Sequence, residues 1–529
     1  MGFWAKSLLI FNAFCANAKQ SLRHVAHQTG LSKSSVHRLK QAMAGRSRHP
    51  ESWLWETEEG RSWLLRLVVA TLYTFGLKRG VGAETLSEFF GRLRLETQVG
   101  CSPGALRHVM QTLEHIILET AEAWEHVGSA NGEMRLIIGA VDETFLERMM
   151  LVCMDLVSGY LLFEEVAAAR RYATWQTVVT ARLEKVGLGV LYLVSDRAKA
   201  LIKLAETGLE CLSIPDLFHL IHELVKSYSL AIGRRLGQAR QALQDAREQF
   251  HAGQTSNPGG AQARQAQAWV EASEAEATRW EGVHNAYRRH LENLALIVHP
   301  WRVEGSTRQT SAEVASRLHA ETRALETLGA THGVAVKKKA LDKVRKQLAG
   351  ISALVDFWWQ EVGQDVQQVA LTPMWTRWVE ELLLPLMYWQ LQVSRTRCPR
   401  RKAHLLQALE AVQNAFEAHP ITWQLAPEVL AGWEAWATEH AKAFQRASSA
   451  VEGRNGYLSQ MQHNHRGLPK HRYKVWTVLH TFDSHAADGT TPASRFFRQK
   501  FPDLFETVLA KLDNLPRPRQ RKQAMALSG

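Results

Sequence analysis

The pattern of apolar and polar residues divides the chain into helical regions and a strand-rich middle. Near the N-terminus, residues 21–43 carry two short apolar faces at helical spacing, separated by Thr29-Gly30. Residues 134–225 instead contain short apolar runs rich in β-branched residues, which predict strands, and amphipathic segments, which predict helices. From residue 229 to residue 440 the periodicity is helical again. The pattern therefore predicts a mixed α/β unit placed between helical regions.

The middle region has a defined order of predicted elements. Residues 134–145 and 148–166 predict three strands, the last two joined at the hairpin-like turn Ser158-Gly159. There follow a helix over 173–186, a strand ending at Asp196, a helix, and a further strand and helix within 209–225. This is the order of a ribonuclease-H-like α/β core, in which the first and fourth strands are neighbours. We therefore expect such a catalytic core, with an N-terminal helix-turn-helix region and a large all-α insertion.

Two aspartates occupy matching places at the ends of predicted strands. The first apolar run reaches Asp142, and the run that starts at residue 189 ends at Asp196. Neighbouring strands would bring both carboxylates to one edge of the sheet, where active sites of open α/β sheets tend to lie. Adjacent carboxylates repel each other, and a bound Mg²⁺ resolves that repulsion. The alternative for each residue alone is a turn or a helix cap.

Residues 21–43 have the spacing of a helix-turn-helix. Leu22 and Val25 face inward on the first helix, Gly30 makes the turn, and Val36 and Leu39 form the buried side of the second helix. The second helix would then expose donors suited to phosphates and base edges in the major groove. The alternative is a helical hairpin with a basic exterior. The predicted DNA-binding residues are Lys33, Ser34, Ser35, His37, Arg38 and Lys40.

Two other helical regions leave alternatives open. Residues 85–125 repeat the helix-turn-helix theme less clearly, with Arg92, Arg94, Arg107 and His108 as DNA contacts or with a helical spacer as the alternative. The insertion combines basic stripes at 336–348 and 395–402 with aromatic clusters at 357–359 and 374–390. These aromatic clusters can stack on DNA bases, but the better interpretation is that they form the core of a helical subdomain.

Composition narrows the class of partner and the compartment. The 64 Lys and Arg exceed the 52 Asp and Glu, giving a formal net charge of +12, which favours a polyanionic partner such as nucleic acid. The 5 cysteines include no CxxC pair, as expected in a reducing compartment. The longest apolar stretch, residues 67–77, falls short of the roughly 20 residues of a membrane span. A cytoplasmic, nucleoid-associated protein is therefore expected, with no membrane partner.

A third acid stands alone in the segment 448–468. Glu452 is followed by basic and amide residues, whereas a solvated helix usually alternates the signs of its charges. A helix resuming the core after the insertion would place Glu452 in its early turns, against the two aspartates. The residues then expected around a DNA phosphate are Arg454, Asn455, His463, His465 and Arg466.

These motifs resemble the DDE transposases of bacterial insertion sequences. The resemblance rests on four stretches: "VDET" at 141–144, "VSDRAKAL" at 194–201, "SSAVEGRNG…HNHRGL" at 448–468 and "DGTTPASRFF" at 488–497. It implies that Asp142, Asp196 and Glu452 are the catalytic acids and hold two Mg²⁺ ions, with Mn²⁺ able to substitute. It also implies cleavage at transposon ends, strand transfer into target DNA, and a homodimer or higher synaptic complex on double-stranded DNA. The helix at 216–224 resembles one that follows the second aspartate in such cores, and His219 either approaches DNA or is structural.

Two other functions compete with transposition: a ribonuclease-H-like nuclease without strand transfer, and a helix-turn-helix repressor whose core is inactive.

The predicted organisation of the chain follows from these assignments. The predicted regions are 1–50 (helix-turn-helix), 51–130 (helical, candidate second DNA-binding region), 131–228 (first part of the core), 229–440 (helical insertion), 441–510 (last core helix and C-terminal region) and 511–529 (basic tail).

Overall fold

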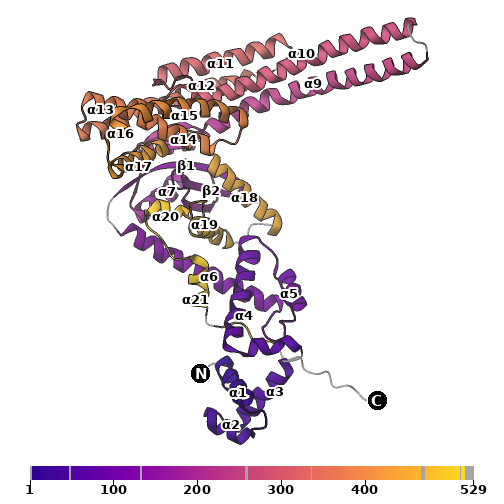
Figure 1. Ribbon diagram of the computed structural model, residues 1–529, viewed down its shortest axis with the longest axis vertical. Coiled ribbons are helices and arrows are strands. Elements are labelled where there is room, and N and C mark those ends of the chain that lie inside the picture. Colours follow the sequence, from indigo (N-terminus) through magenta and orange to yellow (C-terminus); the bar gives the residue numbers. More distant parts are fainter. Residues whose placement is uncertain are drawn as a thin grey trace.

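The chain folds into an elongated molecule with its only described sheet near the middle (Figure 1). The N-terminal helices occupy one end, and a block of helices occupies the other, from which one long helical pair projects sideways. The computed structural model describes residues 3–46, 49–130, 134–256, 260–334, 336, 338–465, 471–512 and 514–518.

The N-terminal unit contains three helices rather than the two predicted. They are α1 (Phe3–Ala16), α2 (Leu22–Thr29) and α3 (Lys33–Arg46). Ile10 of α1 completes a small core with Val25 and Val36, so the apolar N-terminal run is part of this fold. Gly30 makes the predicted turn at φ +68°, and the Ser32 hydroxyl accepts a hydrogen bond from the Ser35 N–H at 3.2 Å. The predicted helix-turn-helix is confirmed.

A helical segment joins this unit to the sheet. The apolar run 67–77 crosses from α4 into the π-helical segment η2, where Leu72 and Leu77 are buried. No helix in the described parts of the chain is both long and apolar enough to span a membrane. The elements of this segment are η1 (Pro50–Glu56), α4 (Glu58–Thr71), η2 (Leu72–Lys78), α5 (Ala83–Arg92) and α6 (Pro103–Ser129).

The sheet is mixed and has the strand order β3-β2-β1-β4-β5. Strands β1, β2 and β3 pair antiparallel, whereas β4 pairs parallel to β1 and β5 parallel to β4. The predicted hairpin between the second and third strands is present, with Gly159 at φ +77°. The strands are β1 (Arg135–Leu146), β2 (Arg148–Asp155), β3 (Leu161–Ala167), β4 (Leu188–Ser195) and β5 (Leu212–Pro215). The intervening helical segments are α7 (Tyr172–Val186), α8 (Lys199–Lys203) and η3 (Leu204–Gly208).

The helical block grows directly out of the sheet unit. Helix α9 starts straight after β5 and continues to Ser256, so the predicted boundary at residues 228/229 falls inside one helix. No glycine or proline cluster interrupts the chain there. The block contains α9 (Leu217–Ser256), α10 (Ala261–Ile297), α11 (Ser311–Thr331), α12 (Lys338–Val369), α13 (Pro373–Trp378), η4 (Val379–Leu383), α14 (Leu384–Arg395), α15 (Pro399–Ala418), α16 (Pro420–Gln424) and α17 (Pro427–Ala443).

Packing inside the block shows how its helices and aromatic clusters are used. Helices α9 and α10 form a long pair, which projects from the body of the molecule (Figure 1). The tryptophans of the aromatic clusters are mostly core residues, including Trp358, Trp378 and Trp389. The aromatic clusters therefore form part of the core of the block, which was the favoured interpretation, rather than a surface for stacking on DNA bases.

After the block the chain returns to the sheet. Helix α18 packs on β1, and α19 packs on β3 and α6. The Tyr192 hydroxyl on β4 donates to the carbonyl of Ala443 at 2.6 Å, and Arg135 at the start of β1 donates to the carbonyl of Phe496 at 2.8 Å. These contacts join two parts of the chain that the block separates. The returning helices are α18 (Ser449–His465), α19 (Arg472–Asp483), α20 (Pro492–Phe497) and α21 (Leu504–Lys511).

The predicted basic tail begins with a docked segment. The Gly100 N–H donates to the carbonyl of Pro516 at 2.7 Å, so residues 514–518 lie against the N-terminal helical segment. Residues 519–529 lie outside the described part of the chain.

Candidate functional site

Asp142 and Asp196 are in register on neighbouring strands. Ala140 of β1 pairs with Val194 of β4, and each aspartate stands two residues beyond its member of that pair. The two carboxylates therefore leave the sheet at the same edge, as predicted. One detail differs, because β1 does not end at Asp142. It continues to Leu146, since residues 143–146 still pair with β2 before the turn at Glu147, whose φ is +59°.

Glu452 reaches this edge from the first turn of α18. Val451 and Leu458 are buried on the side of α18 that packs against β1, while Glu452 is 31% exposed. The Ser448 hydroxyl donates to the carboxylate of Asp216, which anchors the start of α18 to the end of β5. The early-turn position predicted for Glu452 is thus the observed one.

The environment of Asp142 disfavours its charged form. The pKa of Asp142 is raised to about 7. Burial of the carboxyl group is the largest cause, and the negative charge of Glu452 is the second. Asp196 contributes in the same direction, whereas a backbone N–H at Glu143 and the ring of His219 act against the shift. Asp142 is therefore close enough to Glu452 and to Asp196 to be affected by both charges.

Asn455 points at the same carboxylate. Its amide nitrogen donates to Asp142 Oδ2 at 2.7 Å, one turn along α18 from Glu452. Its amide oxygen is buried and has no hydrogen-bond partner among the described residues. This unpaired oxygen is therefore free to accept a hydrogen bond from a ligand, or to bind a cation, beside Asp142.

A second chain of hydrogen-bonded side chains, which was not predicted from the sequence, positions Glu452. The fully buried Asp216 carboxylate accepts from His219 Nδ1 at 2.8 Å, and His219 Nε2 lies 3.2 Å from Glu452 Oε1. The hydrogen bond to Asp216 is the main cause that raises the pKa of His219, and the nearby charges of Asp216, Glu452 and Asp142 add to it. The signal that could have found this chain is the Asp216-to-His219 spacing immediately after β5.

The donor chemistry of the site suits a hard cation, but the ligands are not gathered around one point. Carboxylate oxygens are the ligands that Mg²⁺ prefers. Among the described residues, however, no group of three or more His, Cys, Asp or Glu side chains is placed to hold a metal ion. Glu452 is held by His219 instead. The predicted metal set of Asp142, Asp196 and Glu452 is thus brought to one edge without forming a closed ligand cage.

The basic residues expected around Glu452 are only partly placed as predicted. Arg454 is buried and pairs with the fully buried Glu164 of β3 at 2.6 Å, so its guanidinium does not face a DNA phosphate. The cause is the burial of Glu164, which requires a cationic partner. Asn455 faces Asp142, and His463 is exposed. The side chain of His465 and all of Arg466 lie outside the described residues.

The predicted DNA-binding face of α3 is available to solvent. Ser35 is the exception, since it is half-buried and its hydroxyl lies 2.8 Å from the Ser32 hydroxyl. Lys40 also lies over the ring of Phe14, with Nζ 4.0 Å from the ring centroid. The exposed members of the predicted set are Lys33, Ser34, His37, Arg38 and Lys40.

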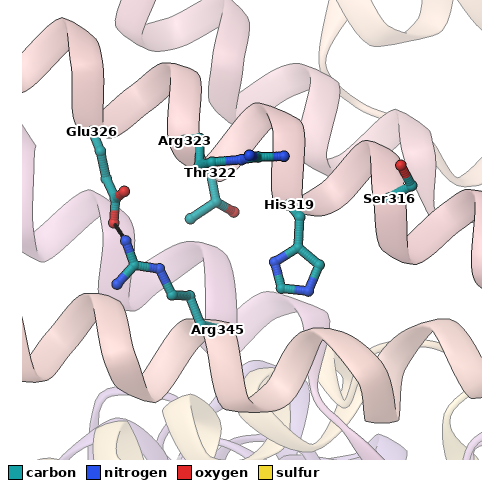
Figure 2. Close-up of a pocket in the computed structure, with 6 residues that line it drawn as sticks. All are labelled: Ser316, His319, Thr322, Arg323, Glu326 and Arg345. Carbon is teal, nitrogen blue, oxygen red and sulfur yellow. Dashed lines mark hydrogen bonds and ion pairs between the residues drawn. The ribbon is translucent and has the colours of Figure 1, made fainter.

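A cavity in the helical block does not offer a competing site. It has a volume of ≈ 520 Å³ between α11 and α12, and Figure 2 shows Glu326 and Arg345 facing each other across it. Arg345 is also paired with Asp342 at 3.1 Å, so its charge is compensated. Arg323 adds a further positive charge to its wall, but none of the three acids lines it. Its lining residues are Ser316, His319, Thr322, Arg323, Glu326 and Arg345.

Comparison with protein families identifies two segments. Residues 5–46 match the IclR helix-turn-helix domain, which covers α1 to α3. Residues 379–524 match a family of unknown function, DUF6399, in a segment that includes Glu452. No curated protein and no solved structure matches the chain. The chain therefore carries an N-terminal helix-turn-helix domain, which supports DNA binding.

Proposed function

We propose that the protein is a DDE-type transposase, which cleaves DNA at transposon ends and transfers the freed strands into target DNA. The observation that carries this proposal is the convergence of three acids from distant parts of the chain. Asp142 and Asp196 are in register on β1 and β4, and the pKa of Asp142 is raised first by burial and next by the nearby charge of Glu452 on α18. Metal-dependent phosphoryl transfer uses carboxylates of this kind, and here they lie at one edge of the sheet without forming a closed ligand cage among the described residues.

The sheet supports the same proposal at the level of the fold. Three antiparallel strands followed by two parallel ones, in the order β3-β2-β1-β4-β5, are what a ribonuclease-H-like core requires. The helical block stands between β5 and α18, where an insertion would precede the glutamate. We therefore interpret β1 to η3, β5 and α18 as a ribonuclease-H-like core interrupted by an insertion.

The residues have distinct roles in this proposal. Asp142, Asp196 and Glu452 would hold two Mg²⁺ ions, which when bound supply a polarised phosphate and an activated water. Asn455 orients the Asp142 carboxylate through its 2.7 Å hydrogen bond. His219, itself held by Asp216, orients Glu452. The helix-turn-helix would hold the DNA ends, and two ends require a dimer or a larger complex.

Two other functions share part of this evidence. A ribonuclease-H-like nuclease would use the same acids and stop after hydrolysis. A helix-turn-helix repressor with an inactive core is favoured by the match at residues 5–46 and by the Glu452–His219 contact, which occupies one acid without a metal. The repressor predicts DNA binding that survives loss of all three acids.

Product analysis with purified protein separates these functions. The substrate is a plasmid carrying the gene with its natural flanking DNA, incubated with wild type or with Asp196→Asn in Mg²⁺. A transposase gives cleaved flanks and joined products with wild type alone. Cleavage without joining indicates the nuclease. Binding by both proteins with no product from either would indicate the repressor and overturn the proposal.

A further inference from the structure

Phe218 places an exposed aromatic side chain beside His219, through which it adjoins Glu452. It is the second residue of α9, and the residue is 42% exposed. The ring centroid lies 5.8 Å from that of His219, the residue that contacts Glu452. The exposed ring of His222, one helical turn further, lies 5.7 Å from it as well. Phe218 and His222 thus form a short aromatic edge next to the site.

The local backbone keeps this ring in place. The Phe218 N–H donates to Asp216 Oδ1 at 2.8 Å, while the other oxygen of the same carboxylate accepts from His219. The turn that orients His219 therefore also fixes the start of the Phe218 side chain. A single exposed phenylalanine is common on protein surfaces. This one is held by the same carboxylate that positions a residue of the proposed site.

The surroundings determine which ligand suits the ring. The ring contacts of Phe218 are with two histidines, and Glu452 lies beyond His219, so the patch is small and partly polar and does not suit an apolar protein surface. A nucleobase combines a flat π-face with polar edges and is attached to the phosphate that the carboxylates require. Aromatic side chains stack on such bases with little dependence on sequence.

We propose that Phe218 stacks on an unpaired nucleobase next to the phosphate that is cleaved. This inference rests on the proposed function and adds a positioning residue to it. A paired base presents its edge to the groove and hides its face in the stack, so the base must leave the duplex to meet the ring. Phe218 would hold that base out of the stack and thereby fix the strand at the carboxylates.

A fluorescent base tests the contact. The probe is a short duplex whose last three pairs are mismatched, with 2-aminopurine in the mismatched segment and Ca²⁺ in place of Mg²⁺ to keep the strands intact. Binding of wild type should quench the fluorescence. Phe218→Leu should lose that quenching and bind about 5- to 150-fold more weakly, the range expected for one base–aromatic stack. Phe218→Trp should retain it. Trp423→Leu is the control, since Trp423 on α16 is also an exposed aromatic residue, at 65%, and lies outside the predicted DNA-binding regions.

Each outcome has a definite meaning. Equal quenching by wild type and Phe218→Leu would overturn the inference, and so would equal losses from Phe218→Leu and Trp423→Leu. The product assay with Asp196→Asn tests the proposed function separately. Asp196-dependent products together with unchanged quenching in Phe218→Leu would overturn the stacking role while leaving the transposase proposal intact.

Discussion

At the scale of single residues, a buried ion pair ties α18 to the sheet. Arg454 contacts Glu164 through two nitrogens, at 2.6 and 2.8 Å, and the Thr477 hydroxyl donates to the same carboxylate. The guanidinium also lies 4.7 Å from the ring centroid of Tyr457. Glu452 is two residues before Arg454 on the same helix, so the pair fixes the position from which Glu452 reaches the aspartates.

Replacing Arg454 should therefore destabilise the fold. Arg454→Met leaves Glu164 buried without its cation, and we expect the free energy of unfolding to fall by about 3–5 kcal/mol. Urea denaturation measures this loss. Arg240→Met is the matched control, because the Arg240–Glu281 pair is exposed and should contribute less than about 1 kcal/mol. Equal effects of the two variants would contradict a structural role for Arg454.

Asp142 makes stability depend on pH in a defined direction. Its pKa in the folded chain is about 7, against an ordinary value of 3.8. Between these values the folded chain keeps a proton that the unfolded chain has lost, so this residue lowers stability as pH rises from about 4 to 7. Asp142→Asn removes that effect. We expect it to stabilise the metal-free protein by about 1–2 kcal/mol at pH 8, after allowance for solvent screening.

Thermal unfolding of wild type and Asp142→Asn at pH 5 and pH 8 measures this difference. The stabilisation should be smaller at pH 5, where Asp142 remains largely protonated in the folded wild type. A difference that is the same at both pH values would contradict the burial and charge repulsion described for Asp142.

At the scale of single elements, α3 is the part of the helix-turn-helix that should contact DNA. Lys33→Ala, Arg38→Ala and Lys40→Ala together remove three exposed cations. If each neutralises one phosphate, the slope of log affinity against log salt should become less steep by about 2.7. Fluorescence anisotropy with duplex DNA from the flanks of the gene, at several salt concentrations, measures the slope.

The long helical pair provides the control for this experiment. Arg240, Arg247 and Arg279 are also exposed, but each is paired with a glutamate. Replacing all three by alanine should leave the salt slope unchanged. An unchanged slope in the α3 variant, or an equal change in the control, would contradict the assignment of α3 to DNA.

Local patterns predicted elements well where those elements depend on local contacts. The hairpin at Gly159, the turn at Gly30 and the early-turn position of Glu452 follow from turn chemistry and short-range periodicity. The extension of β1 beyond Asp142 did not follow, because it depends on pairing with β2. The continuation of α9 through the predicted boundary did not follow either. A helix can continue without any special sequence signal, so its length there depends on tertiary packing.

The acids of the site were predictable, whereas their partners were not. Parallel strands bring residues at matching positions to one edge, so Asp142 and Asp196 could be paired from the sequence. The contact of His219 with Glu452 joins the first helix of the block to the helix that follows the block, and that of Ser448 with Asp216 joins residues that follow and precede the block in sequence. The burial of Arg454 likewise depends on β3. No local pattern carries information about such distant contacts.

At the scale of the whole molecule, the sheet lies between the helix-turn-helix and the helical block (Figure 1). The carboxylates at its edge are completed by α18, a helix that follows the block in sequence and returns to the sheet. In the function that we propose, this arrangement keeps the helix-turn-helix that would hold a DNA end apart from the site that would cut it. The helical block is also continuous with the sheet unit, because α9 begins directly after β5, next to the site, and extends into the projecting helical pair.

Transposition in cells tests the central claim most directly. A plasmid carrying the gene with its native flanking DNA is introduced, and excised donor sites and new target junctions are sequenced for wild type and for Asp196→Asn. We predict junctions with wild type and none with Asp196→Asn at equal expression. Junctions at the same frequency from both proteins, or none from an expressed wild type with intact flanks, would contradict the assignment of the three acids to strand transfer.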